Sequence, residues 1–366
     1  MEFIATAAFG LEGQVKQELI QLEFEARAEV GGARFHTGMA GAFKANLWLA
    51  CADRVMWVLA EAETLTFDAL FELVRAIPWE DVLPKDAAFP VSGHCARSQL
   101  MSVSDCQKIV KKAIAERLKQ RHKTEWFPET GPVFPVSVTI SRNITRIAVD
   151  TTGEALNRRG FRTYVGEAPI RETLAAAMLR LSGWDLKRPL HDPCCGSGTL
   201  MMEAAFLAAN RASGLSRAFA MENWPQSDSQ ANRSLREEAQ ALYRPDKLPP
   251  LSGSDINPEA LGLSRRHLRQ AGLDGMVSVY PANLYQLNLE TDRPFFIANP
   301  PYGERLGDKK AADRLAAGFG DLLARHPGAS LAVITANPSF ERMLKRKAKS
   351  RRRLYNGRLE CEFLVF

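Results

Sequence analysis

The second half of the sequence predicts an α/β fold with a largely parallel sheet, preceded by a smaller α+β region. Three observations support this prediction: short apolar runs alternate with helical patterns, glycine- or proline-rich turns follow the runs, and polar side chains sit where the runs end. The expected strands are 189–192, 251–256, 277–280, 295–298 and 330–335, with helices at 171–181, 199–210, 258–271 and 311–325.

The first 150 residues show strand and helix patterns in a less regular order. Residues 13–22 and 104–119 carry apolar side chains at helical spacing, whereas 136–140 and 145–150 alternate like paired strands. The segment 153–166 is basic and glycine-punctuated, which predicts a linker. Residues 211–248 form a polar insertion to which the sequence assigns no role.

Composition restricts the class of protein. A chain of 366 residues with 46% hydrophobic and 25% charged residues is typical of a globular protein with two or three domains. No apolar run reaches the length of a membrane span, and residues 1–5 do not begin a signal peptide. Six scattered cysteines without a Cys-x-x-Cys pair favour a reducing, cytoplasmic location. The net charge of +6 permits a nucleic-acid partner without establishing one. None of the six histidines has metal-ligand spacing, so we expect no metal.

Polar residues follow four successive expected strands. Asp192 ends the first strand, and a Gly-Ser-Gly turn follows it. The turn leads into a helix whose N-terminus favours negative charge. The same sequence could also form a tight turn without a ligand. Asp255 ends the second strand and could accept ribose hydroxyls, or could serve only in the turn before the next helix. Asn283 follows the third strand and could contact the edge of an adenine. Ligands bind at the carboxyl ends of strands in such folds, so four contacts in this order indicate one site.

The fourth of these contacts is the sequence Asn299-Pro300-Pro301-Tyr302. The two prolines restrict the backbone, so an amide oxygen and an aromatic ring project side by side from a rigid turn. An amide oxygen beside an aromatic ring suits a planar base with an exocyclic amino group. The alternative is that the segment binds no ligand and is a Pro-rich turn whose tyrosine packs against the protein. The Asn299 side-chain oxygen and the Pro300 carbonyl could accept the two amino hydrogens, while Tyr302 stacks on the base.

Three motifs together resemble a known family: Asp-Pro-Cys-Cys-Gly-Ser-Gly-Thr from 192, Ser-Asp-Ile-Asn-Pro from 254, and Ala-Asn-Pro-Pro-Tyr-Gly-Glu-Arg-Leu-Gly from 298. They resemble the THUMP-domain class I RNA methyltransferases, most of all the bacterial 23S rRNA guanine-N2 methyltransferases. The resemblance implies a Rossmann-like methyltransferase domain with a seven-stranded mixed sheet over residues 169–366. It also implies a ferredoxin-like subdomain at 1–60, a THUMP RNA-binding domain at 61–152 and a linker at 153–168.

The same resemblance implies S-adenosylmethionine as the cofactor. Asn283 departs from the family pattern, which has an aspartate for the adenine amino group, and we expect weaker affinity as a result. The implied cofactor-binding residues are Thr173, Asp192, Cys195, Gly196, Ser197, Gly198, Thr199, Asp255, Ile256, Asn283 and Asn299.

The implied reaction is methyl transfer to the N2 amine of a guanine in large-subunit rRNA, with Asn299, Pro300, Pro301 and Tyr302 as catalytic residues. Guanine N2 in tRNA, adenine N6, and a non-catalytic role in RNA binding or ribosome assembly remain alternatives. We expect RNA as the partner, with no membrane and no obligate protein partner. The basic side chains expected to contact RNA, or otherwise to be solvated surface charges, are Arg97, Lys108, Lys111, Lys112, Arg158, Arg159 and Arg305.

Overall fold

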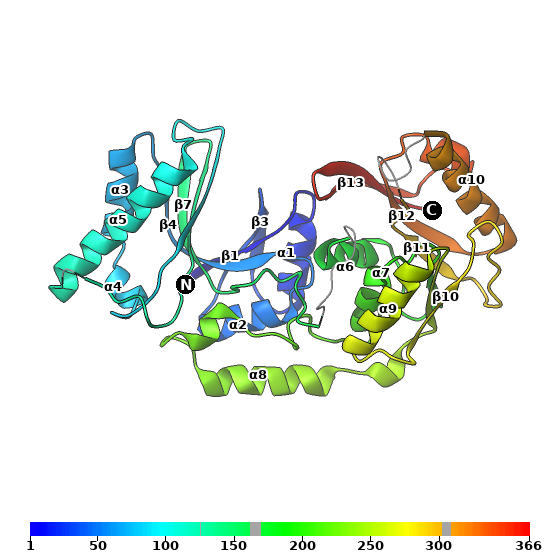
Figure 1. Ribbon diagram of the computed structural model, residues 1–366, viewed down its shortest axis with the longest axis horizontal. Helices are drawn as coiled ribbons and strands as arrows, with labels where there is room; N and C mark the ends of the chain where they lie inside the picture. The colour runs from blue at the N-terminus through cyan, green and yellow to red at the C-terminus, as the bar shows by residue number, and fades with distance from the viewer. Residues whose placement is uncertain (125, 162–169, 302–308) are drawn as a thin grey trace.

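The protein consists of two seven-stranded sheets that lie side by side along its long axis (Figure 1). The computed structural model describes residues 1–124, 126–161, 170–301 and 309–366. Within these residues, no helix combines the length and the apolar character that crossing a lipid bilayer requires.

The N-terminal sheet has the strand order β2-β3-β1-β4-β7-β6-β5, and only the β5–β6 pair is parallel. Its central strand β4 begins before and ends after the expected boundary at residue 60, so the two expected N-terminal units share one sheet. The elements are β1 (Glu2–Thr6), α1 (Glu12–Gln21), β2 (Ala26–Glu29), β3 (Gly32–His36), α2 (Met39–Trp48), β4 (Arg54–Glu63), α3 (Phe67–Ala76), α4 (Trp79–Val82), β5 (Val91–Ala96), α5 (Val103–His122), β6 (Val136–Ser141) and β7 (Ile144–Asp150).

The C-terminal sheet confirms the expected mixed α/β architecture. The five expected strands are present with ends within one residue, and the four expected helices with ends within two. The elements are α6 (Glu172–Leu181), β8 (Leu190–Asp192), α7 (Thr199–Ala208), η1 (Ala220–Asn223), α8 (Ser229–Leu242), η2 (Pro245–Lys247), β9 (Leu251–Asp255), α9 (Pro258–Gln270), β10 (Val277–Pro281), β11 (Phe295–Ala298), α10 (Lys309–Arg325), β12 (Ser330–Thr335), α11 (Phe340–Leu344), β13 (Ser350–Asn356) and β14 (Leu359–Val365).

The strand order β10-β9-β8-β11-β12-β14-β13 places a topological switch point beside β8. From β8 the chain moves outward to β9 and β10, and then returns to β11 on the other side of β8. Strands β8 to β12 are parallel, so the loops after β8 and β11 leave the same edge of the sheet in opposite directions. This arrangement opens a crevice at that edge, where open α/β sheets bind ligands.

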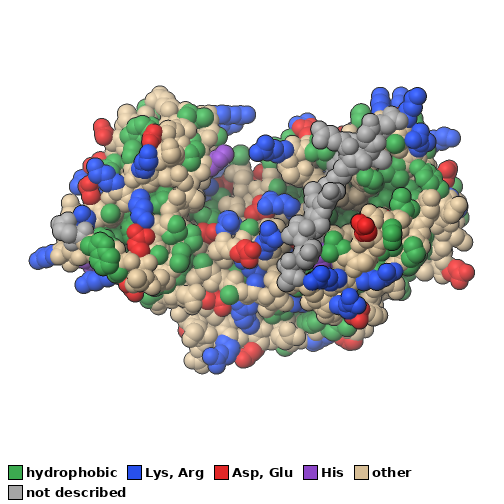
Figure 2. Space-filling view, in the orientation of Figure 1, with side chains coloured by type: hydrophobic (Ala, Val, Ile, Leu, Met, Phe, Trp, Pro, Cys, Tyr) green, Lys and Arg blue, Asp and Glu red, His purple; other side chains and the backbone are tan. Residues whose placement is uncertain are grey.

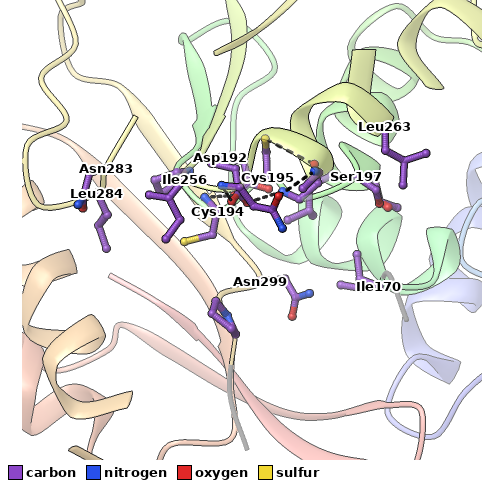
Figure 3. A pocket seen from close by; sticks show the side chains of 18 of the residues that line it. Ile170, Asp192, Cys194, Cys195, Ser197, Ile256, Leu263, Asn283, Leu284 and Asn299 are labelled. Atoms are coloured by element: carbon purple, nitrogen blue, oxygen red, sulfur yellow. Dashed lines mark hydrogen bonds between the residues drawn. The ribbon is translucent and has the colours of Figure 1, made fainter. Parts of the chain in front are cut away.

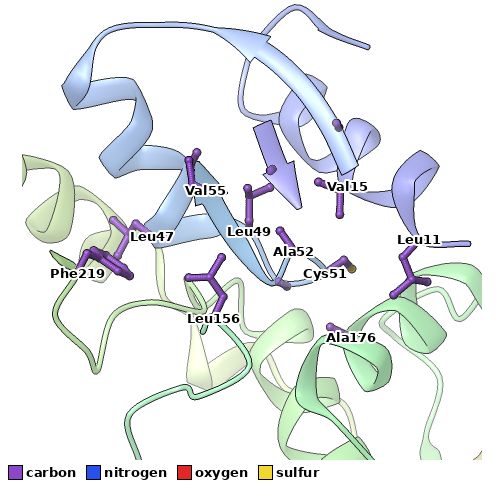
Figure 4. Close-up of a cluster of buried hydrophobic side chains, with 14 of the residues drawn as sticks. Leu11, Val15, Leu47, Leu49, Cys51, Ala52, Val55, Leu156, Ala176 and Phe219 are labelled. Atoms are coloured by element: carbon purple, nitrogen blue, oxygen red, sulfur yellow. The ribbon is translucent and has the colours of Figure 1, made fainter. Parts of the chain in front are cut away.

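One hydrophobic core joins the two sheets. Ala176 of α6 faces Leu11 and Cys51 of the N-terminal region, and all three side chains are buried (Figure 4). The same core includes Phe219, which precedes η1 and packs edge-on against Phe43 of α2. The two halves of the molecule are therefore packed against each other rather than connected only by the linker.

Residues 211–248, to which the sequence assigned no role, form much of this junction. Helix α8 runs along the underside of the molecule below α2 (Figure 1), and the Arg236 guanidinium lies 5.1 Å from the ring centroid of Phe43. The ring of Trp224 stacks on Phe134, which precedes β6, at a centroid distance of 4.4 Å. Its indole N–H donates to the Val133 carbonyl over 2.9 Å. The insertion is a strap from the C-terminal sheet to the N-terminal one.

Candidate active site

The glycine-containing loop between β8 and α7 is held in shape by backbone hydrogen bonds. The Cys194 N–H donates to Asp192 Oδ1 over 2.9 Å, and the Gly198 N–H donates to the Cys195 carbonyl over 2.8 Å. The Cys195 N–H donates to the Ser254 carbonyl of β9 over 3.0 Å. The loop is therefore fixed both to its own strand and to the neighbouring one.

Two glycines permit this close packing. Gly198 has φ +82°, and a Cβ atom there would lie 2.4 Å from the Ser264 hydroxyl on α9. Gly253 on β9 faces Cys195, whose Cβ would lie 2.7 Å from an added Cβ. A side chain at either position would push the loop away from β9 and α9, because atoms cannot approach so closely.

Asp255, at the end of β9, holds the loop from the other side. Its Oδ2 accepts from the Gly196 N–H, and its Oδ1 accepts from the Asn257 N–H, both over 2.9 Å. Each carboxylate oxygen can accept more than one hydrogen bond, so both retain capacity for a ligand hydroxyl.

Asp192 lies beneath the loop and is 2% exposed. Burial raises the pKa of this carboxyl to about 8; the hydrogen bond from Cys194 opposes the rise, and the nearby Asp255 charge adds to it. Desolvation penalises the carboxylate unless a positive charge approaches it. Asp192 is thus a neutral group near pH 7 that a cationic ligand would ionise.

A cavity of about 660 Å³ opens at this edge of the sheet, within the range of small-molecule sites. Figure 3 shows Asn299 and Ile170 across the cavity from Cys194, Cys195 and Ser197. Among the residues expected to bind the cofactor or to act in catalysis, ten line it: Asp192, Cys195, Gly196, Ser197, Thr199, Asp255, Ile256, Asn283, Asn299 and Pro301.

Asn299 follows β11 and lines the cavity. Its side-chain oxygen is buried and has no hydrogen-bond partner among the described residues. A buried polar atom without a partner costs about 1–3 kcal/mol, so an asparagine of the cavity wall that carries such an atom is suited to a ligand donor. Together with the loop and Asp255, it makes the cavity fit a nucleoside-containing cofactor beside an amino-bearing substrate.

Asn283 has a local hydrogen bond that the sequence did not predict. It lines the cavity, but its side-chain oxygen already accepts from the Tyr285 N–H over 3.1 Å in a local turn. The following residues, Leu284 and Tyr285, line the cavity as well. The sequence did not predict these two residues, although their position directly after a strand end was a usable signal. It also did not predict Ile170, which lines the cavity but does not follow a strand.

Three other expected site residues lie outside the cavity wall. Thr173 is buried in α6, where its hydroxyl donates to Asp53 Oδ1 over 3.4 Å. Gly198 and Pro300 are not part of the wall formed by the described residues. Gly198 shapes the loop from behind, and Pro300 is buried next to Asn299. Tyr302 and Arg305 lie outside the described residues.

The expected RNA-contacting cations have mixed placements. Arg97 is exposed, whereas Lys108, Lys111 and Lys112 on α5 each pair with a carboxylate. Arg158 is half exposed and lies 4.0 Å from Glu154.

The prediction that Arg159 contacts RNA or is a solvated surface charge was wrong. Its side chain is 1% exposed and forms a buried ion pair with Glu203 over 3.0 Å, and it also donates to the Ala50 carbonyl. A buried guanidinium needs such partners, and here they bind α7 to the N-terminal region. Arg159 cannot reach RNA from this position.

The mixed sheet with β14 antiparallel beside β12, the glycine loop at its switch point and the acid ending the next strand are the arrangement of a class I S-adenosylmethionine-dependent methyltransferase. Comparison with known families agrees. A family described as RMKL-like methyltransferase domain matches residues 159–364, more than half of the chain. An RlmL ferredoxin-like domain matches residues 2–56, and a THUMP domain matches residues 65–150. The chain belongs to the RMKL-like methyltransferase family.

Individual relatives extend this result. The chain is 35% identical to "Putative RNA methyltransferase YpsC" of Bacillus subtilis, over 99% of this chain and 95% of that protein. It is also 35% identical to "Ribosomal RNA large subunit methyltransferase K/L" of Allochromatium vinosum, covering 100% of this chain but 51% of that protein. The chain thus spans about half the length of the K/L protein. The crystal structure of SMU.472 complexed with SAH covers 100% of this chain and 97% of its own, with 37% identity and a TM-score of 0.94.

Proposed function

We propose that this protein transfers a methyl group from S-adenosylmethionine to the exocyclic N2 amine of a guanine in large-subunit rRNA. The proposal depends on the side-chain oxygen of Asn299, a cavity residue, which is buried and has no hydrogen-bond partner in the described part of the chain. The names of the relatives support RNA as the substrate, and that of the K/L protein supports large-subunit rRNA.

The cavity wall provides separate places for the parts of the cofactor. Asp255 has acceptor capacity for the ribose hydroxyls, and Ile256, 74% exposed beside it, offers an apolar surface for the adenine. The glycine loop and Asp192 lie where the methionine end would be held. When bound, the cofactor supplies an activated methyl group on a sulfonium.

The guanine N2 amine needs orientation, because its lone pair is delocalised into the ring. The Asn299 side-chain oxygen would accept one amino hydrogen. The Pro300 carbonyl is the proposed acceptor of the other on the grounds of its sequence position, since Pro300 is not part of the cavity wall formed by the described residues. These two hydrogen bonds would hold the amine with its lone pair directed at the methyl group and would favour localisation of the pair. Catalysis of this kind depends on positioning, for which misplacement alone can cost about 100-fold.

The target base must leave any stack or duplex to reach the cavity, as in other enzymes that modify bases. Tyr302 is the proposed stacking partner for the extruded base, on the grounds of its sequence position after Pro301. Stacking of a base on an aromatic side chain contributes about 1–3 kcal/mol.

The test combines a deletion strain with one variant. Nucleoside mass spectrometry of rRNA and tRNA from the strain should show the loss of N2-methylguanosine from large-subunit rRNA alone. In complementation, Asn299→Ala should reduce methylation at least about 100-fold while calorimetry still detects S-adenosylmethionine binding. Near-normal turnover by Asn299→Ala would rule out the role of this residue.

The same experiment separates the alternatives. A missing methyl group in tRNA, or on adenine N6, would replace the proposed substrate, because the same acceptors suit any exocyclic amine. An unchanged nucleoside profile would favour a non-catalytic role in RNA binding or ribosome assembly.

A further inference from the structure

Helix α9 has one exposed face and one buried face. Figure 2 shows Lys and Arg side chains on the surface where α9 lies in Figure 1, and Arg265, Arg266 and Arg269 of this helix are exposed. The opposite face carries the buried residues Leu261, Ser264, His267 and Leu268. The face of a helix that packs against a sheet is normally apolar, yet two of these four residues are polar.

The two polar residues, Ser264 and His267, contact the glycine loop in different ways. Ser264 lies against Gly198, but its buried hydroxyl has no hydrogen-bond partner among the described residues. The Nδ1 atom of His267, one turn further along α9, lies 3.1 Å from the Ser197 carbonyl oxygen. A carbonyl oxygen can only accept a hydrogen bond, so His267 carries a proton on Nδ1 and donates it. Ser264 therefore packs against the loop, whereas His267 bonds to it.

The hydrogen bond from His267 completes a clamp on the peptide group that joins Ser197 to Gly198. The carbonyl of this group accepts from His267. Its N–H, which belongs to Gly198, donates to the Cys195 carbonyl over 2.8 Å. Glycine adopts left-handed and right-handed backbone conformations about equally readily, so Gly198 does not fix this orientation by itself. Its φ of +82° depends on the contacts around it.

The clamped peptide group lies at the wall of the cavity. Ser197 lines the cavity, whereas His267 is 1% exposed and is not part of the wall formed by the described residues. The Ser197 carbonyl is therefore directed behind the loop, away from the space for the cofactor. A carbonyl turned toward the cavity would place a partial negative charge near the carboxylate of the methionine end, and the two would repel each other.

We infer that His267 is a positioning residue for S-adenosylmethionine, which holds the Ser197–Gly198 peptide group in the orientation that accepts the methionine end. It acts through the loop and does not itself contact the cofactor. The inference rests on the proposed function in one respect, the placement of the methionine end at the glycine loop, and does not depend on which base of the RNA is methylated. The alternative is that His267 stabilises the fold alone.

The test compares two substitutions of similar size at position 267. Asparagine carries a side-chain N–H at the branch position of the histidine Nδ1 and can donate to the Ser197 carbonyl, whereas leucine has a similar shape without a donor. In calorimetry, His267→Leu should bind S-adenosylmethionine at least about tenfold more weakly than the wild type, because the carbonyl loses its partner. His267→Asn should stay within about threefold of the wild-type affinity, because the hydrogen bond is kept.

Trp184→Phe is the matched control for the loss of a buried hydrogen bond. The Trp184 side chain is 6% exposed, and its indole N–H donates to the Arg188 carbonyl over 2.9 Å. Arg188 precedes β8, so this bond lies at the edge of the sheet opposite the cavity. The control should have a lower melting temperature and an unchanged affinity for S-adenosylmethionine. If His267→Leu shows the same two results, His267 stabilises the fold alone and the inference is wrong.

The proton on His267 is measured independently in the wild-type protein, so the inference stays testable even if His267→Leu does not fold. Long-range proton–nitrogen NMR spectra of protein with isotope-labelled histidine distinguish a protonated from an unprotonated Nδ1, and the signal absent from His267→Asn identifies the residue. We expect a protonated Nδ1, because only a protonated nitrogen can donate to the carbonyl. An unprotonated Nδ1 would overturn the inference.

The wild-type affinity separates failure of this inference from failure of the proposed function. A wild-type protein that binds S-adenosylmethionine, with equal affinities in His267→Leu and His267→Asn, would overturn the inference alone. A wild-type protein that does not bind S-adenosylmethionine would overturn the proposed function as well.

Discussion

The backbone N–H of Gly196 donates to the Asp255 carboxylate over 2.9 Å, and this bond joins the loop after β8 to the end of β9. The same carboxylate accepts from the Asn257 N–H at the start of α9. One side chain therefore sets the positions of the loop, the second strand and the next helix before any ligand binds. Preorganisation of this kind lowers the cost of binding, because fewer groups must be ordered.

Replacing Gly198 by alanine should damage this arrangement. The residue has φ +82°, and its new Cβ would lie 2.4 Å from the Ser264 hydroxyl. The left-handed backbone alone costs a non-glycine residue about 1–2 kcal/mol, and the contact adds to that cost. We expect a lower melting temperature and at least about tenfold weaker S-adenosylmethionine binding, measured by calorimetry.

Gly262→Ala provides the matched control for this prediction. Gly262 lies within α9, and an added Cβ would meet no atom within 4 Å. Alanine in the middle of a helix is more favourable than glycine by about 0.5–1 kcal/mol, so this variant should be slightly more stable. Equal stability and affinity in the two variants would contradict the role assigned to Gly198.

Binding of S-adenosylmethionine should release a proton from Asp192. The pKa of this carboxyl is raised to about 8, so it is mostly protonated at pH 7, and a cationic ligand favours the carboxylate. Affinity should therefore rise with pH toward about 8, by up to tenfold per unit, and level off above it. Calorimetry in buffers of different ionisation enthalpy measures the proton release directly.

Asp192→Asn isolates this effect from protons on the ligand itself. An asparagine oxygen can still accept from the Cys194 N–H, which Asp192 does over 2.9 Å, so the loop should keep its shape. The variant should bind more weakly, and the proton release due to Asp192 should disappear. The same proton release in both proteins would show that Asp192 is already ionised in the free enzyme.

The sequence predicted the catalytic half of the fold well because its signals are local. Each expected strand is a short apolar run ended by a turn, and Asp192, Asp255 and Asn299 lie at strand ends where parallel topology brings them to one edge. Once the strand order is known, the order of these residues along the chain is enough to predict that they line one cavity.

What the sequence did not predict depends on contacts between distant segments. Arg159 looks like any exposed cation in a basic linker, and only the partner Glu203 on α7 makes it a buried residue. The polar composition of residues 211–248 hides the fact that Trp224 is almost fully buried against Phe134. The local turn that occupies the Asn283 oxygen is likewise a matter of side-chain geometry.

Breaking the Arg159–Glu203 pair should destabilise the junction between the halves. Glu203→Ala leaves a guanidinium that is 1% exposed without its carboxylate, and removing one member of a buried pair costs about 3–5 kcal/mol. Glu154→Ala, which removes the partner of the exposed Arg158, should change the free energy of unfolding by less than about 1 kcal/mol. Urea denaturation measures both, and similar values for the two variants would refute the distinction.

Trp224 should fix the position of the N-terminal half relative to the active site. Its ring is 3% exposed, stacks on Phe134 at 4.4 Å and donates to the Val133 carbonyl, so Trp224→Ala should cost about 3–5 kcal/mol. If the strap only stabilises the fold, the variant should show wild-type kinetics below its melting temperature. We instead expect KM for RNA to rise at least about tenfold while S-adenosylmethionine affinity stays unchanged, because an RNA held by both halves is then misplaced. Trp224→Phe keeps the stacking and should restore most of the wild-type KM, and its failure to do so would assign the effect to the lost indole hydrogen bond.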